Sequence, residues 1–377
     1  MKVLVDKIQR FLSDLKRPFV GRDEEAEALT LGLMTGEHVL FIGEPGTAKS
    51  ALARRAALLV NARFFKYLLT RFTEPDELFG PLDIKALREG KYVRITTGRL
   101  PEAEIAFIDE VFNANSAILN TLLTIMNERV IYDGYTEIKT PLWSLISSSN
   151  SVPDEPELQA IYDRFLIRQF VKPVGEDKWA SLLQASWRIE QGLYESAEPV
   201  LSMSDLRSIS QLVFQVDLSG VIEPLLKLYA VLEDQGIHVT DRRKGKALKV
   251  IAAKALLEGR LKALEEDLFV LKFIVPRDSE EANKVYATLT DEIRSRERVL
   301  RELDDILANV REAKAFVEAV NELDPRLLDY LRALEKAREK VERLVKEASD
   351  EVLRKKAVSV QSEIAEVLEL IKTKLVM

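Results

Sequence analysis

The stretch that decides the fold is VLFIGEPGTAKSALARRAALLV, which occupies residues 39–60. A short apolar run, a glycine-rich turn and an amphipathic run are typical of a buried strand followed by a turn and a helix. The phosphate-binding P-loop has the pattern G-x-x-x-x-G-K-S/T. Gly43 opens this pattern and Lys49 and Ser50 close it, but Ala48 stands where the last glycine is usual. Alone, the stretch is compatible with a nucleotide site and equally with a strand, turn and helix that only resemble one.

The effect of Ala48 depends on its backbone conformation. A P-loop needs glycine where φ is positive or where the backbone approaches phosphate oxygens closely, and Gly43 and Gly46 remain for these roles. We expect Ala48 to enter the helix with a negative φ, where a small side chain is acceptable. Its N–H still donates to a phosphate, and the N-terminus of a helix favours anions. The substitution is therefore compatible with nucleotide binding.

The second motif is IAFIDE, an apolar strand that ends in Asp109 and Glu110, about sixty residues after Lys49. A buried strand that ends in two carboxylates is by itself commonly only a strand end. At this distance from a P-loop, however, it is typical of ATPases that hold Mg²⁺ with the aspartate and activate water with the glutamate. We therefore assign Asp109 to the metal and Glu110 to general base catalysis.

Two further motifs have both a structural and a functional interpretation. LWSLISSSN is an apolar strand that ends at Asn150, which would form an Asx-turn or orient the attacking water. LQAIYDRFLIRQF places Arg164 on a helix, where most arginines are solvated or pair with a residue one turn away. Arg164 would act in catalysis only if a neighbouring subunit offered a γ-phosphate to it.

A last motif, HVTDRRKGKAL, begins a helix with Arg242 and Arg243. Cations at a helix N-terminus oppose the helix dipole, so their presence there favours an anionic ligand nearby. The alternative is a solvated, basic start of a helix.

Composition excludes several classes of protein. The chain has 377 residues, enough for two or three domains, and its net charge of −7 makes it a poor binder of polyanions. It has no cysteine, which excludes disulfides and thiolate metal sites, and its two histidines are too few for a histidine-rich site. No signal peptide and no membrane span are expected, so the expected location is the cytoplasm.

The pattern of apolar residues divides the chain into three parts. Residues 1–175 alternate strand and helix patterns, which predicts an α/β domain. Residues 176–276 contain amphipathic runs at a helical period. Residues 277–377 contain no glycine and have apolar residues at three- and four-residue spacing, which predicts long antiparallel helices. These helices would form either a bundle packed on the body or a projecting coiled coil that serves as a partner platform.

Read together, these motifs resemble the MoxR family of AAA+ ATPases and, within it, most closely the RavA branch. The resemblance covers about residues 15–275 and rests on six segments: GEPGTAKS, TRFTEPDELFGPLDI, LPEAEIAFIDEVFNANSAILNTLLTIMNER, SSSN, YDRFLIR and TDRR. The RavA branch has a β-rich insertion near its C-terminus, where this chain shows only helices. Partners that depend on that insertion cannot be transferred.

The resemblance implies a P-loop core with a parallel sheet flanked by helices, an all-α lid and a ring, usually a hexamer. An insert within about residues 80–100 would point toward the ring pore, and NERVIYDGYTEIKTP would form a hairpin. The implied cofactors are ATP and Mg²⁺. The implied activity is chaperone-like remodelling of a protein, often with a partner that carries a von Willebrand factor A domain.

The resemblance also implies the roles of individual residues. Those expected to contact the nucleotide are Val20, Gly21, Gly43, Glu44, Pro45, Gly46, Thr47, Ala48, Lys49, Ser50, Ala51, Asp109 and Arg243. Of these, Val20 and Gly21 would lie against the adenine, and Ser50 and Asp109 would hold Mg²⁺. The expected catalytic residues are Glu110, Asn150, Arg164 and Arg242.

Two other functions remain as alternatives. One is a motor that acts on nucleic acid, because related rings with such inserts move on DNA; the net negative charge argues against it. The other is a nucleotide-dependent scaffold that does not hydrolyse ATP; the adjacent carboxylates Asp109 and Glu110 argue against it.

Overall fold

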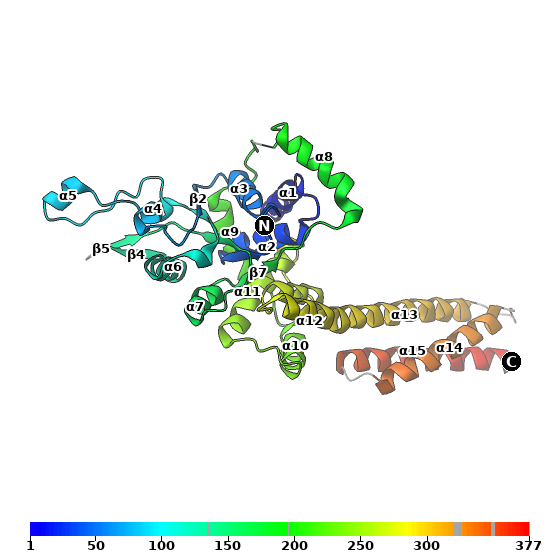
Figure 1. Ribbon diagram of the computed structural model, residues 1–377. Helices are drawn as coiled ribbons and strands as arrows, with labels where there is room; N and C mark the ends of the chain where they lie inside the picture. The colour runs from blue at the N-terminus through cyan, green and yellow to red at the C-terminus, as the bar shows by residue number, and fades with distance from the viewer. Residues whose placement is uncertain (134–135, 195, 320–323, 325, 348–350, 377) are drawn as a thin grey trace. The chain divides into compact units, whose positions relative to one another are not determined.

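The computed structural model describes residues 1–133, 136–194, 196–319, 324, 326–347 and 351–376. The chain forms two compact units, Met1–Ala287 and Thr288–Met377, each with a hydrophobic core (Figure 1). Among the described residues, no helix is both long and apolar enough to cross a membrane.

The first unit is built around a parallel sheet with the strand order β2-β3-β6-β1-β7. Its strands are β1 Val39–Ile42, β2 Phe64–Leu68, β3 Ile105–Asp109, β6 Ser144–Ser149 and β7 Ile167–Phe170. β1 and β6 are buried along their whole length, as expected for central strands covered on both faces. The register aligns the strand ends, because Ile42 lies beside Ser149 and Leu68 lies beside Asp109. The carboxyl edge of the sheet therefore gathers the segments that follow β1, β3 and β6.

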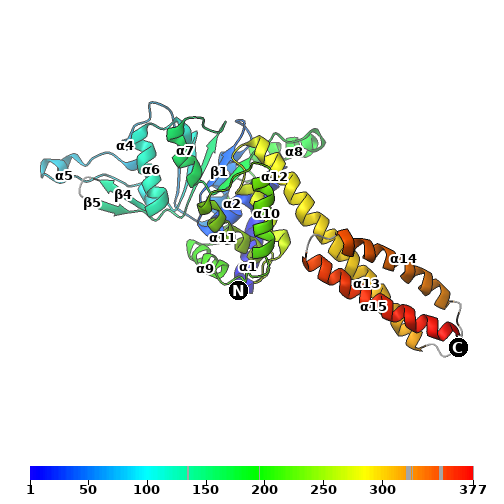
Figure 2. The same cartoon turned by 90° about the horizontal axis from the view of Figure 1, so that it is seen from below.

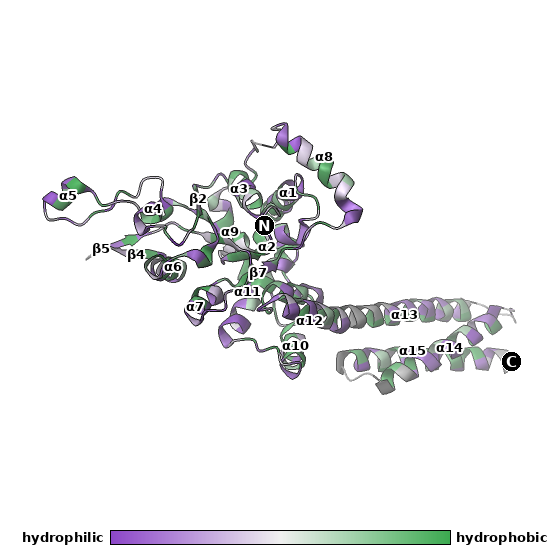
Figure 3. Cartoon of the chain, viewed as in Figure 1, coloured by the Kyte–Doolittle hydropathy of each residue, from purple (hydrophilic) through white to green (hydrophobic). Residues whose placement is uncertain are grey.

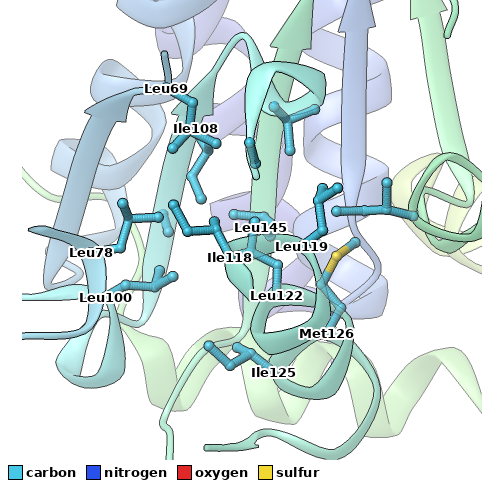
Figure 4. Packing of buried hydrophobic residues seen from close by; sticks show 14 of the residues in the cluster. Leu69, Leu78, Leu100, Ile108, Ile118, Leu119, Leu122, Ile125, Met126 and Leu145 are labelled. Atoms are coloured by element: carbon cyan, nitrogen blue, oxygen red, sulfur yellow. The ribbon is translucent and has the colours of Figure 1, made fainter. Parts of the chain in front are cut away.

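Helices cover both faces of this sheet. On one face, α2 contacts β1 and β7, and α3 contacts β3 and β6. The other face packs its apolar side chains against α6, as Figure 4 shows for Ile108 and Leu145 beside Ile118 and Leu122. Asn115 directly precedes α6, and its side chain accepts a hydrogen bond from the N–H of Ile118 and caps the helix. The helices of this part are α1 Lys2–Lys16, α2 Asp23–Thr35, α3 Lys49–Val60, α4 Pro75–Phe79, α6 Ser116–Glu128 and α7 Pro156–Arg164.

The segment predicted as an insert contains the short helix α5 (Ile84–Arg88), which has no buried residue. An antiparallel bridge between Leu82 and Arg94 closes the loop that carries this helix. β4 (Val130–Asp133) and β5 (Thr136–Lys139) pair as a separate antiparallel ribbon, as the sequence predicts. In both views α5 and this ribbon lie at the same end of the first unit (Figures 1 and 2).

The rest of the first unit is helical. Its helices are α8 Trp179–Glu190, α9 Met203–Val213, α10 Ile222–Asp234 and α11 Asp241–Leu257. Short 3₁₀ segments are η1 Leu100–Glu102, η2 Val111–Asn113, η3 Glu176–Lys178 and η4 Glu265–Phe273. α9 and α11 both pack on α2, whereas α8 has no buried residue.

The second unit is an antiparallel helical bundle. Its elements are α13 Ser295–Ala319, α14 Arg326–Glu347 and α15 Glu351–Val376, preceded by the π-helical segment η5 Thr290–Arg294; α12 Ser279–Leu289 spans the unit boundary. α15 packs against both α13 and α14. Leu303, Val310 and Val317 recur at seven-residue spacing on α13 and are all buried, and the hydropathy colours alternate along the three helices (Figure 3). The helices therefore bury their apolar faces against one another, and the fold class predicted from the sequence is confirmed.

Candidate nucleotide-binding site

The P-loop connects β1 to α3 and depends on glycine at two positions. Gly43 has a φ of 153°, and a Cβ there would lie 2.3 Å from the carbonyl oxygen of Val171. Gly46 has a φ of 79° and has open space around it. Lys49 is the first residue of α3, so the backbone N–H groups of the loop and of the first helical turn face one side of the carboxyl edge.

Ala48 differs from the prediction. Its φ is 64° and its ψ is 16°, so it lies in the left-handed region rather than entering the helix with a negative φ. This conformation costs a residue with a Cβ roughly 1–2 kcal/mol, which explains why glycine is usual at this position. Ala48 occupies the N-cap position of α3, directly before Lys49.

Lys49 bends back over the loop. Its ammonium group donates to the carbonyl oxygens of Gly43, at 2.7 Å, and Glu44, at 2.6 Å, and to the hydroxyl of Thr47 at 3.3 Å. Partial burial lowers the pKa of Lys49, and the nearby carboxylates of Asp109 and Glu110 oppose that shift. The P-loop cation therefore lies within electrostatic reach of both acidic residues.

Asp109 is oriented by a residue that the sequence analysis missed. The hydroxyl of Ser148 on β6 donates a hydrogen bond to Oδ1 of Asp109 on the adjacent strand β3. The sequence did contain a signal, because Ser147, Ser148 and Ser149 form a polar run within a strand that is buried on both faces. Such strands are normally continuously apolar, so each of these serines called for a partner.

Glu110 follows β3 in a strained conformation, with a φ of 54° and a ψ of 48°. Burial and the neighbouring Asp109 raise the pKa of Glu110, while Lys49 and a hydrogen bond from the backbone N–H of Asn150 lower it. The structure thus brings Lys49, Asp109, Glu110 and Asn150 together. Strained non-glycine residues concentrate at functional sites, and both Ala48 and Glu110 belong to this group.

A cavity of about 850 Å³ adjoins the P-loop. Residues from four segments line it: Pro18, Phe19, Val20 and Arg22 before α2; Glu44, Pro45, Gly46, Thr47, Ala48, Ala51, Arg54, Arg55 and Leu58 in the P-loop and α3; Pro173 and Val174 after β7; and Trp179, Leu182, Ala185, Ser186, Ile189 and Tyr194 around α8. Gly21 instead lines an adjacent cavity of about 540 Å³, and Arg22 lines both. The wall formed by α8 was not anticipated from the sequence. Ser50 is half-buried on α3 directly after Lys49.

Arg164 lies at the opposite edge of the sheet. It ends α7, directly before β7, and the first residue of β7, Ile167, is paired with Val39 at the start of β1. Arg164 therefore lies near the start of β1, whereas the P-loop follows its end. Along the strand direction, the two are separated by the length of β1, about 10 Å. Nε of Arg164 is buried and has no hydrogen-bond partner in the described part of the chain. Arg164 is thus not brought together with Lys49 in its own subunit.

Arg242 and Arg243 also lie at this opposite edge, against Asp163 of α7. Nη1 of Arg242 is 3.1 Å from Oδ2 of Asp163, and Nη1 of Arg243 is 3.4 Å from Oδ1. Arg243 is only 3% exposed and also donates to the carbonyl oxygens of Leu166, at 2.6 Å, and Ile274, at 2.9 Å. Burial lowers the pKa of Arg243 to about 9.

These contacts correct the interpretation of the two arginines. The anion that explains a cation at the start of α11 is Asp163 of the same chain, not a bound nucleotide. The assignment of Arg243 to nucleotide binding is wrong for its own subunit, because its guanidinium is enclosed by protein oxygens. Arg242 remains about one-third exposed and adjoins the same carboxylate.

A parallel sheet with a P-loop after β1, an acidic pair after β3, which lies on the far side of β6, and a following helical region define a P-loop ATPase of the AAA type. Comparison with protein families gives the same answer. A model described as the MoxR domain in the MoxR-vWA-beta-propeller ternary systems matches residues 6–211, and an AAA lid domain model matches residues 220–289. The chain belongs to the MoxR family of AAA ATPases.

Several curated proteins are similar in sequence to this chain. An uncharacterized protein of Methanocaldococcus jannaschii is 41% identical over 281 residues, which is 74% of each chain, and a second is 36% identical over 339 residues, covering 89% of this chain and 87% of its own. The chaperone MoxR1 of Mycobacterium tuberculosis is 28% identical over 168 residues, or 44% of each chain. A crystal structure of a protein from Cytophaga hutchinsonii, itself only proposed to be an ATPase, has the same fold, with a TM-score of 0.63 at 20% identity. It covers 77% of this chain and 95% of its own.

Proposed function

We propose that this protein hydrolyses ATP with Mg²⁺ and uses the reaction to remodel or activate a protein partner. The observation that carries the proposal is the convergence of Lys49, Asp109, Glu110 and Asn150 at one edge of the sheet, beside a cavity of about 850 Å³. The loop amides and the N-terminus of α3 suit a triphosphate, because helix N-termini favour anions.

The residues at this edge fit a magnesium ion. Mg²⁺ prefers hard oxygen ligands and is usually held by one or two protein groups together with substrate phosphates. The hydroxyl of Ser50 and the carboxylate of Asp109 supply such oxygens, and the hydrogen bond from Ser148 fixes the rotation of Asp109. When bound, Mg²⁺ would neutralise charge on the phosphates.

Glu110 would accept a proton from the attacking water. Its raised pKa makes its carboxylate a stronger base than an exposed glutamate, which suits proton abstraction. The strained backbone at Glu110 directs the side chain toward the segment after β6, where the N–H of Asn150 contacts it. We assign Asn150 to the orientation of that water.

We infer that the active form is a ring, with a homohexamer as its expected size. The placement of Arg164 at the amino edge of the sheet supports this inference, because from there it could reach only the nucleotide of a neighbouring copy. Arg242 is partly exposed and pairs with Asp163, the residue that precedes Arg164. It would therefore face the same neighbouring copy. Arginines supplied in this way stabilise the charge that develops on the transferred phosphate.

The partner that we propose is a protein with a von Willebrand factor A domain. Support comes from the matching family model, which describes systems that contain such a domain, and from the relative named as a chaperone. The RavA branch and the division into a core at 1–175, a lid at 176–276 and an extension at 277–377 remain our proposals. The loop around α5 would face the ring pore, consistent with its exposure.

The test is Mg²⁺-dependent ATP hydrolysis by the full chain and two variants. Lys49→Ala should abolish nucleotide binding. Glu110→Gln should retain ATP but lose turnover by about 10²-fold or more, as expected for loss of a positioned base. Glu137→Gln, an exposed change on β5, is the control and should behave as the wild type. Undiminished turnover by Glu110→Gln would show that Glu110 is not the general base.

A further inference from the structure

Arg55 on α3 is a buried cation whose hydrogen bonds are incomplete. The residue is only 8% exposed, and its Nε donates to the carbonyl oxygen of Asp14 at 2.8 Å. Its guanidinium carbon lies 5.5 Å from the ring centroid of Tyr194. Nη1 is buried and has no hydrogen-bond partner among the residues that the structure describes.

Within the part of the chain that the structure describes, no acceptor completes the hydrogen bonds of this group. The carboxylate of Asp14 pairs with Arg10 at 3.6 Å, and the hydrogen bond that Arg55 makes to Asp14 goes to its backbone oxygen. Burial lowers the pKa of Arg55, and the nearby charge of Asp14 opposes that shift. A buried, unsatisfied charged donor is costly unless an acceptor meets it. Arg55 lines the cavity of about 850 Å³, and that cavity is where such an acceptor could enter.

The position of Arg55 along α3 indicates which part of a nucleotide it would meet. It lies six residues after Lys49, which corresponds to a rise of about 9 Å along the helix axis. Phosphates bound at the start of α3 are therefore at the other end of the cavity. The wall near Arg55 is apolar and aromatic, formed by side chains such as Leu58, Ile189 and Tyr194, and suits a flat base better than a sugar with hydroxyls.

We propose that Arg55 recognises the purine base of the bound nucleotide by donating a hydrogen bond to one of its ring nitrogens. A guanidinium can only donate, so its partner must be an acceptor, and N1, N3 and N7 are the acceptors on the adenine ring. The aromatic ring of Tyr194 holds the guanidinium plane in place. This inference rests on the proposed function, because it requires that the site binds ATP.

The experiment measures the dissociation constants of ATP and of its 1-deaza, 3-deaza and 7-deaza analogues for the full chain. One analogue should bind the wild type about 10-fold more weakly than ATP, as expected for loss of one charge-assisted hydrogen bond. Arg55→Met should bind ATP more weakly by the same factor and should no longer distinguish ATP from that analogue. Arg10→Met removes a cation that contacts the same Asp14 outside the cavity and should discriminate as the wild type does.

Three outcomes would overturn the inference. If Arg55→Met weakens ATP and all three analogues equally, Arg55 acts only through the fold. If the wild type instead discriminates against 2′-deoxy-ATP or 3′-deoxy-ATP, and Arg55→Met loses that discrimination, the contact is to the ribose. If the wild type does not bind ATP, the proposed function fails as well. Should Arg55→Met not fold, Arg55→Lys keeps the charge and is expected to lose the same discrimination, because an ammonium lacks the reach of the guanidinium fork.

Discussion

The two edges of the parallel sheet in the first unit carry different parts of the proposed reaction site. The carboxyl edge holds Lys49, Asp109 and Glu110, to which we assign phosphate binding, metal binding and the activation of water. The amino edge holds Arg164 and Arg242, which lack a phosphate within reach in their own subunit. This separation underlies the proposal that one copy has the groups that bind ATP but lacks catalytic positive charge, so that we expect two copies to be needed for turnover.

The largest effect is expected from Arg164→Ala. Loss of an arginine supplied by a neighbour typically lowers turnover by roughly 10³–10⁵, while ATP binding at the carboxyl edge should stay near normal. ATP hydrolysis and ATP affinity are measured side by side. Arg63→Ala, which removes an exposed arginine before β2, serves as the control.

Mixing Arg164→Ala with Lys49→Ala sharpens the comparison of the two edges. At a shared interface, the Lys49→Ala copy supplies Arg164 to the intact P-loop of the Arg164→Ala copy. The mixture should therefore regain part of the activity that each variant lacks. If cross-linking shows mixed rings but the mixture stays inactive, the amino edge is not a source of catalytic charge.

A smaller effect is expected at the carboxyl edge from Ser148→Ala. Removing the hydrogen bond that orients Asp109 should raise the Mg²⁺ concentration needed for half-maximal hydrolysis by about 10–100-fold. The matched control is Ser147→Ala, because the hydroxyl of Ser147 is buried on the same strand and has no hydrogen-bond partner among the described residues. Equal shifts in the two variants would mean that Ser148 does not position the metal ligand.

The amino edge should show a pH dependence of its own. His38 is fully buried, its Nδ1 accepts from the N–H of Leu145, and burial with the nearby cation of Arg129 holds the pKa of His38 well below its usual value. Because the unfolded chain binds this proton more readily, the stabilisation is complete above about pH 6.5 and is lost as pH falls toward the lower folded pKa.

The measurement is the free energy of unfolding between pH 8 and pH 5 for the wild type and for His38→Gln. The variant should show a flatter profile, since glutamine offers an acceptor that does not titrate. Parallel profiles would show that His38 does not contribute to acid sensitivity.

The smallest of these effects concerns backbone strain in the P-loop. Ala48→Gly should relieve roughly 1–2 kcal/mol of left-handed strain and lose about 0.4–1 kcal/mol through the greater freedom of the unfolded chain. Ala51→Gly lies inside α3 and should only destabilise, by roughly 0.5–1 kcal/mol. Urea titrations compare the two variants, and equal destabilisation would show that Ala48 is not strained.

The sequence indicated which residues gather at the carboxyl edge, but it did not indicate the contacts at the amino edge, for a physical reason. Each element of the carboxyl edge is a local pattern, an apolar strand followed within a few residues by polar groups such as Lys49 or Asp109, and parallel pairing brings those ends together. At the amino edge, Arg243 pairs with Asp163, which lies 80 positions earlier in the chain. Its structural role therefore depends on a distant residue. No local pattern contains that pair.

The remaining differences have the same origin. The φ of Ala48 is set by the path of the whole loop, and the role of Ser148 is set by the neighbouring strand β3. The wall that α8 adds to the cavity, and with it Tyr194 beside Arg55, depends on where that helix packs in three dimensions. The spacing of residues in the sequence does not encode any of these features.

The enclosure of Arg243 has a mechanical consequence. One guanidinium joins the start of α11 to Asp163 of α7, to Leu166 before β7 and to Ile274 after η4, so these elements are fastened to the sheet as one block. We therefore expect little hinge motion within one copy at this junction. ATP hydrolysis should instead displace one copy relative to the next. Distances between spin labels on α7 and α11 should stay the same with ATP and with ADP, whereas labels on adjacent copies should move apart or together.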